Sequence, residues 1–164
     1  MPGINNTKIL KAKAMLSVAK ELIDQGKKVR ITVTGNSMYP FLRDSKDSVL
    51  LTLADYKDIE FGDVILVLHN DDRYVMHRVI KKKKQYFYTS GDAAGYREGP
   101  LYPDQIIAKV VRVYRKDRDI SCGNLIWRGL SLVWFAVLPF RSFLIRCYRF
   151  SSRMIRTVRS KLSV

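Results

Sequence analysis

The chain has 164 residues, of which 30 are Lys or Arg and 15 are Asp or Glu, so its formal net charge is 30 − 15 = +15. With 47% hydrophobic and 27% charged residues it has the composition of a folded protein, which excludes disorder throughout. It contains no run of about 18 uncharged apolar residues, so it predicts no conventional membrane-spanning helix. Cys122 and Cys147 lack the spacing of metal ligands, and no motif indicates a metal or a cofactor.

The positive charge is concentrated at the C-terminal end. The last acidic residue is Asp119, and the basic residues after it are Arg128, Arg141, Arg146, Arg149, Arg153, Arg156, Arg159 and Lys161. Residues 1–119 therefore carry 22 basic and 15 acidic groups, a net charge of +7, and residues 120–164 carry +8. The charge divides the chain into a mildly basic part and a strongly basic tail.

Residues 1–27 predict one amphipathic helix. Asn6 or Thr7 can cap its start, Gly26 is placed to end it, and the apolar positions between them recur at steps of three and four. Lysines interrupt these apolar residues, so the segment lacks the continuous apolar stretch of a cleavable signal peptide. We therefore expect the protein to lie on the cytoplasmic side of the membrane.

Residues 28–118 predict a mostly antiparallel β domain, because short β-branched and aromatic runs alternate with segments rich in Gly, Pro, Asn and Asp. The expected strands are 29–33, 49–53, 64–68, 74–80, 86–89 and 106–114. The basic run 81–84 is expected in a solvated hairpin turn, and residues 91–104 are expected to form a loop.

Residues 119–164 form the third predicted unit, a basic and aromatic tail. The stretch 126–140 is almost wholly apolar, and Pro139 can begin a second helix whose apolar residues lie opposite its arginines. Basic amphipathic helices of this kind are typical of proteins that bind the surface of an anionic membrane. The large apolar face favours lipid over nucleic acid, and the alternative is that the aromatic residues belong to the protein core.

Three residues on separate β elements are candidates for catalysis. Ser37 follows a predicted strand in a tight turn made by Gly35 and Asn36, which can expose its hydroxyl group and its backbone N–H. His77 lies within an apolar strand, and Asp92 begins a loop. A serine hydroxyl needs a base to act as a nucleophile near neutral pH, and a carboxylate can orient the histidine that serves as that base.

The order of these motifs resembles that of the signal peptidase I and LexA-like serine peptidases. The similar segments, within residues 30–115, are 35–40, 61–65, 76–80, 89–92 and 106–110. The sequence His-Arg-Val at 77–79 resembles the endoplasmic-reticulum and archaeal signal peptidases, which pair Ser with His, whereas the bacterial signal peptidases and LexA-type proteins pair Ser with Lys. The resemblance implies a mainly β fold: a LexA/signal-peptidase-like antiparallel core with an N-terminal helix and C-terminal amphipathic helices.

By this resemblance Ser37 is the nucleophile, His77 is the general base and then the general acid, and Asp92 is the orienting carboxylate. The N–H of Ser37 would serve as an oxyanion donor. The related enzymes carry further acidic residues after the Gly-Asp pair, so Glu98 and Asp104 are the alternatives to Asp92. The position two residues before the serine is a glycine, so the hydroxyl oxyanion donor of the bacterial type is absent there.

The function expected from this resemblance is that of a membrane-associated endopeptidase. It would cleave the leader or signal segment of a peptide or protein precursor bound as an extended strand. One alternative is a self-cleaving regulator like LexA or UmuD, which the single helix before Ser37, the lack of an Ala-Gly or Cys-Gly pair before it, and the histidine at position 77 disfavour. The other alternative is a protein that binds anionic lipid without catalysis.

Overall fold

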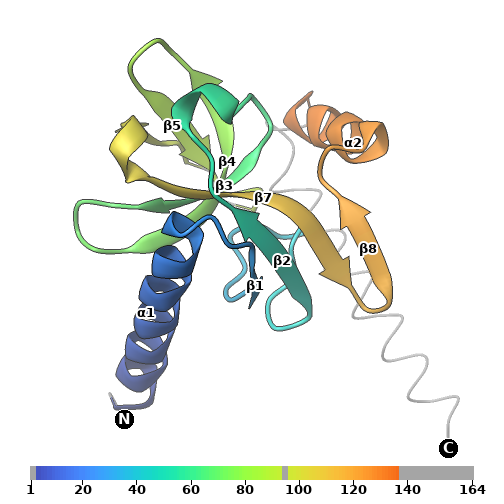
Figure 1. Cartoon of the computed structure of the whole chain (residues 1–164). Helices are drawn as coiled ribbons and strands as arrows, with labels where there is room; N and C mark the ends of the chain where they lie inside the picture. The colour runs from blue at the N-terminus through green and yellow to red at the C-terminus, as the bar shows by residue number, and fades with distance from the viewer. Residues whose placement is uncertain (1–2, 94–95, 137–164) are drawn as a thin grey trace, which may run out of the picture.

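In this computed structural model, residues 3–93 and 96–136 are described. They form an eight-stranded antiparallel sheet in the order β1-β2-β7-β3-β4-β5-β6, with β8 paired to β7, and a helix at each end of the described chain (Figure 1). The strands are β1 (Val29–Thr32), β2 (Asp47–Thr52), β3 (Val64–Leu68), β4 (Tyr74–Lys82), β5 (Phe87–Ser90), β6 (Glu98–Leu101), β7 (Ile106–Arg115) and β8 (Arg118–Ser121). The mainly β fold expected from the sequence is confirmed.

The N-terminal helix α1 spans Gly3–Asp24 and so begins earlier than the expected caps at Asn6 or Thr7. It ends where the sequence predicts, because Gly26 adopts a left-handed conformation with φ of 78°. The N–H groups of Gly26 and Lys27 donate to the carbonyls of Ile23 and Leu22 at 2.8 and 3.0 Å. Ile23 is fully buried, so the end of the helix is fixed on the core.

Two strands were not expected from the sequence. Strand β6 has the sequence Glu-Gly-Pro-Leu and, among the described strands, pairs with β5 alone at the edge of the sheet, where its turn-forming residues are tolerated. Strand β8 is charged and pairs with the second half of β7, whose first half pairs with β3. The domain boundary expected between residues 118 and 119 falls inside β8.

The sheet buries apolar side chains on both of its faces, and the side chains of β3 alternate between the two core clusters that result. Val64 and Leu66 of this strand belong to one core cluster, which also contains residues of α1, β1, β2 and β7. Ile65 and Val67 belong to a second cluster with residues of β4, β5 and β6. A strand buried on both faces is apolar throughout, which accounts for the continuous Val-Ile-Leu-Val-Leu run.

Helix α2 spans Leu125–Ala136 and lies beside β8, at the other end of the fold from α1 (Figure 1). Its Trp127 belongs to the same core cluster as Ala19 and Ile23 of α1. Its inner face is buried at Trp127 and Ser131, and the ring of Phe41 meets the Trp127 and Trp134 rings edge-on at centroid distances of 5.5 and 5.9 Å. Its outer face exposes Leu125, Ile126, Leu130, Leu132 and Val133. Part of the aromatic tail is therefore core and part is exposed.

Within residues 3–93 and 96–136, no helix combines the length and hydropathy needed to cross a bilayer. The second amphipathic helix, expected after Pro139, lies outside the described residues.

Candidate active site

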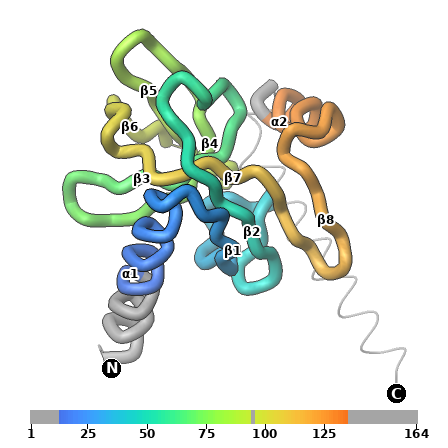
Figure 2. Tube along the Cα trace, viewed as in Figure 1, coloured from blue at the N-terminus to red at the C-terminus, as the bar shows by residue number. Residues whose placement is uncertain are grey.

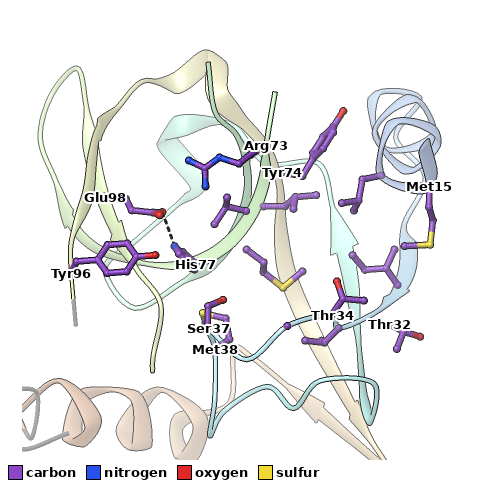
Figure 3. A pocket seen from close by; sticks show the side chains of 17 residues that line it. Met15, Thr32, Thr34, Ser37, Met38, Arg73, Tyr74, His77, Tyr96 and Glu98 are labelled. Atoms are coloured by element: carbon purple, nitrogen blue, oxygen red, sulfur yellow. Dashed lines mark hydrogen bonds and ion pairs between the residues drawn. The ribbon is translucent and has the colours of Figure 1, made fainter. Parts of the chain in front are cut away.

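A groove with a cavity volume of about 280 Å³ brings residues from distant parts of the chain together (Figure 3). At one end it is lined by Ser37, His77 and Glu98. Met38, Leu66 and Met76 are among the residues that line it further along, and it reaches Met15 and Leu16 of α1. The loop between β3 and β4 extends on the side of α1 (Figure 2), to which it is joined by the ion pair between Lys13 and Asp72. The groove therefore has polar groups at one end and an apolar lining along its length.

Ser37 lies in the loop that connects β1 to β2 and is exposed, whereas the next residue, Met38, is buried beneath it. Gly35 has φ of 87°, a conformation that favours glycine, and its N–H donates to Asp44 Oδ1 at 2.9 Å. The carbonyl of Ser37 accepts the N–H of Ala93 at 2.8 Å. The loop is thus held on both sides while the serine stays accessible.

The far end of the same loop is fixed by Asp47, whose side chain is fully buried. It accepts the backbone N–H of Arg43 at 2.9 Å and the guanidinium groups of Arg43 and Arg115 at 3.0 and 2.8 Å. Burial would raise the pKa of this carboxyl, but the hydrogen bonds from Arg115 and Arg43 outweigh it, and the pKa lies below its usual value of 3.8. Arg115 also donates to the carbonyl of Phe41 at 2.6 Å, which ties β7 to the serine loop.

His77 lies in the middle of β4 and is only 2% exposed. Its Nδ1 lies 2.7 Å from Glu98 Oε2, and Figure 3 shows the ring between Glu98 and Ser37. Because an ionised carboxylate only accepts hydrogen bonds, this contact places the ring proton on Nδ1. Nε2 then carries no proton and can act as a base. Burial lowers the pKa of His77 below 6.5 and the charge of Glu98 only partly opposes it, so the imidazole is neutral at neutral pH.

Asp92, the residue expected to orient His77, forms a buried ion pair with Arg78. Its two carboxylate oxygens accept the Nε and Nη2 groups of Arg78 at 2.8 and 2.6 Å. The remaining Nη1 group of Arg78 donates to the carbonyl of Gly62 at 2.8 Å and to Ser131 Oγ at 3.0 Å. The carboxylate on His77 Nδ1 is that of Glu98, one of the two alternatives. The other alternative, Asp104, lies in the short helix η2 (Pro103–Gln105).

Sequence reasoning missed the residues that support this site from a distance. The role of Arg78 could have been predicted, because an arginine inside an apolar strand needs a buried acidic partner, and Asp92 follows a glycine downstream. The roles of Ser131 and Trp134 could not, because these residues lie in α2 and only the fold brings them to the site. Trp134 Nε1 donates to the carbonyl of Asp92 at 3.1 Å.

An exposed serine, a buried neutral histidine and a carboxylate on that histidine, grouped in one groove of a β fold, are the arrangement of a serine peptidase. The profile of the Peptidase S24-like family matches residues 2–111, which is more than half of the chain. The chain therefore belongs to the Peptidase S24-like family, and its class is that of the serine peptidases. A comparison with curated proteins finds no match.

Proposed function

We propose that the protein is a serine endopeptidase of the signal-peptidase type, in which Ser37 is the nucleophile, His77 the general base and Glu98 the orienting carboxylate. The observation that carries this proposal is the 2.7 Å contact between His77 Nδ1 and Glu98 Oε2, made in the groove that Ser37 lines. It supports histidine as the base, because no lysine lines this groove in the described part of the chain. A serine–histidine pair is what distinguishes the endoplasmic-reticulum and archaeal signal peptidases within the superfamily.

The chemistry follows from these positions. His77 Nε2 takes the proton of the Ser37 hydroxyl as the oxygen attacks the scissile carbonyl, and the backbone N–H of Ser37 donates to the resulting oxyanion. His77 then gives the proton to the leaving amine, which departs and leaves an ester on Ser37. A water molecule gives a proton to His77 as its oxygen attacks the ester, and His77 returns that proton to Ser37 Oγ as the ester bond breaks, which releases the acid and restores the serine. Glu98 stays ionised and stabilises the imidazolium formed at each attack.

The proposed substrate is the leader or signal segment of a peptide or protein precursor. The groove lies between the chain that leads from β1 to Ser37 and the first half of β4, so an extended peptide can lie along both. Its apolar lining includes Ile31, Leu66 and the methionines at positions 15, 38 and 76. Methionine side chains adapt to apolar groups of different shape, which suits the apolar part of a leader segment.

Cleavage of a leader-type peptide tests the proposal. We expect Ser37→Ala and His77→Ala to abolish cleavage and to leave the circular dichroism spectrum of the folded protein unchanged. Ser121→Ala, in the exposed strand β8, is the matched control and should cut at the wild-type rate. Cleavage by the Ser37→Ala variant would contradict the mechanism. Mass spectrometry of the purified protein separates the self-cleaving regulator, because that alternative requires truncation upstream of Ser37 with no added substrate.

We also propose that the protein binds an anionic membrane surface through residues 120–164 and does so from the cytoplasmic side. The exposed apolar residues of α2 support a lipid partner, because they form one side of a helix whose other side is anchored in the core. The chain that continues from α2, residues 137–164, holds only basic charged side chains. Such a sequence favours anionic lipid headgroups.

Flotation with vesicles that contain phosphatidylserine tests the membrane proposal. A deletion of residues 120–164 is a poor variant, because it would remove Trp127 from the core and Ser131 from Arg78. The double variant Leu132→Glu with Val133→Glu changes only the exposed face, and we expect it to lose vesicle binding. Leu53→Glu, an exposed apolar residue of the β domain, should still bind. Equal flotation of both variants, or of the wild type with neutral vesicles, would contradict the proposal.

A further inference from the structure

The second histidine of the chain also faces the carboxylate that holds His77. His69 lies in the loop between β3 and β4, and its side chain is 16% exposed. Its Nε2 atom is buried and forms no hydrogen bond within the described residues, and it lies 3.6 Å from Glu98 Oε2. The same oxygen is 2.7 Å from His77 Nδ1. Two imidazole rings therefore approach one carboxylate oxygen.

The backbone around His69 is well fixed, so this approach is a built feature of the loop. The N–H of His69 donates to the carbonyl of Arg73 at 2.9 Å, and its carbonyl accepts the N–H of Asp72 at 2.9 Å. Gln105, from η2, donates to the carbonyl of Leu68 at 3.3 Å and so braces the preceding residue. A buried ring nitrogen without a partner is costly, and a movement of a few tenths of an ångström would bring Nε2 within hydrogen-bond distance of Glu98.

We propose that His69 is a positioning residue for the His77–Glu98 pair: its Nε2–H group directs the Glu98 carboxylate onto His77 Nδ1. The role in catalysis rests on the function proposed above. With Glu98 held from two sides, the imidazole of His77 has a fixed orientation and tautomer before the substrate binds, which lowers the cost of reaching the reactive geometry.

The shared oxygen also couples the protonation of the two rings. A proton on His69 places a second positive charge beside Glu98, and this charge lowers the pKa of His77. Among the described residues, the other charged or titratable groups that act on the pair include Asp71 and Arg73 of the β3–β4 loop, Asp92 in the loop after β5, and Tyr96 before β6. Asp71 and Arg73 hydrogen-bond to each other at 2.6 Å. Glu98 is thus the carboxylate that both rings share.

The test uses the fact that the chain contains only two histidines, so the NMR signals of both rings can be followed as the pH is changed. His69→Gln keeps a donor near the position of Nε2 but cannot be protonated, whereas His69→Leu removes the donor. We expect the pKa of His77 to be higher in both variants than in the wild type. We expect kcat to fall between roughly tenfold and a hundredfold in His69→Leu, with KM unchanged, and His69→Gln to recover most of kcat above pH 7.5. Lys84→Gln, on an exposed turn, is the control and should match the wild type.

An unchanged titration of His77 in both variants, or wild-type kcat in His69→Leu, would overturn the proposal. The titration needs no substrate, so it reports on the coupling even if the peptidase activity itself is absent. Loss of cleavage in every protein together with a shifted titration would contradict the proposed function and support the coupling of the two histidines. Cleavage at the wild-type rate in His69→Leu would support the proposed function and contradict the positioning role of His69.

Discussion

Glu98 Oε2 lies 2.7 Å from His77 Nδ1, and both residues line the same groove as Ser37. Glu98 begins an edge strand, β6, which pairs with β5 but lies beyond the loop that follows Asp92. The carboxylate next to the histidine is therefore supplied by the strand after the Gly-Asp motif. Asp92 itself accepts two hydrogen bonds from Arg78, the residue that follows His77.

The two carboxylates predict different consequences of amide substitution. Glu98→Gln removes the charge that raises the pKa of His77 and offers an amide that can donate to Nδ1 in the wrong tautomer. We expect kcat to fall at least roughly a hundredfold, the acid limb of the pH profile to move to lower pH, and the melting temperature to change little. The measurement is kcat/KM against pH.

Asp92→Asn is the matched variant, because it makes the same chemical change on the other carboxylate. It leaves the guanidinium group of Arg78 buried without its counter-charge, so we expect the free energy of unfolding to fall by about 3 kcal/mol in urea denaturation. If Asp92→Asn abolishes kcat at wild-type stability while Glu98→Gln is active, the assignment of Glu98 as the orienting residue is wrong.

The wild-type protein should lose activity in acid as His77 becomes protonated. Burial lowers the pKa of this imidazole, so the half-maximal rate on the acid limb is expected below pH 6.5, the ordinary value for histidine. The same shift affects stability: the preference of the fold for neutral His77 is fully present above pH 6.5 and is lost as the pH falls through the folded pKa. An acid limb centred above pH 6.5 would contradict a buried histidine as the base.

The anchor of the serine loop predicts a second dependence on pH. Asp47→Asn should lower the free energy of unfolding by about 3 kcal/mol at pH 7, because it removes a buried negative charge that binds Arg43 and Arg115. The pKa of Asp47 is depressed, so this difference from the wild type is present above pH 3.8 and shrinks as the pH falls through the folded pKa.

Asp72→Asn provides the control for this measurement, which is urea denaturation followed at several pH values. Its ion pair with Lys13 is exposed, and we expect a loss of about 0.5 kcal/mol or less. Equal losses in the two variants would show that Asp47 does not anchor the loop.

The sequence predicted the central strands well because their signals are local. The run 64–68 is apolar on both faces, as β3 is in the structure, and Gly26 ends α1 through its own backbone conformation. It could not place Glu98, because the signals of Gly99 and Pro100 favour a turn and only pairing with β5 makes this segment a strand. The pairing of Arg78 with Asp92 rather than with another acidic residue likewise could not be predicted, because it depends on the register between β4 and β5, and the local sequence pattern does not determine that register.

Close packing at Gly99 holds β6, and with it Glu98, against β5, so a larger side chain at this position should lower the rate of catalysis. Gly99 has φ of 127°, and a Cβ there would lie 2.8 Å from the Tyr88 ring and 2.9 Å from the carbonyl oxygen of Phe87. Gly99→Ala must therefore push β6 away from β5, and with it the neighbouring Glu98. We expect kcat to fall about tenfold or more. Gly129→Ala, in open space on α2, should keep the wild-type kcat, and loss of activity in both would contradict this explanation.

The two faces of α2 can be separated by alanine substitutions at adjacent positions. Trp127 is 8% exposed and contacts Phe41, so Trp127→Ala leaves a cavity and should lower the free energy of unfolding by about 3 kcal/mol or more. Ile126 is 72% exposed, so Ile126→Ala should cost about 0.5 kcal/mol or less. Urea denaturation measures both changes. Vesicle flotation should report the reverse order, because Ile126 belongs to the exposed face and Trp127 does not. A stable Trp127→Ala protein would show that α2 is not part of the folded domain.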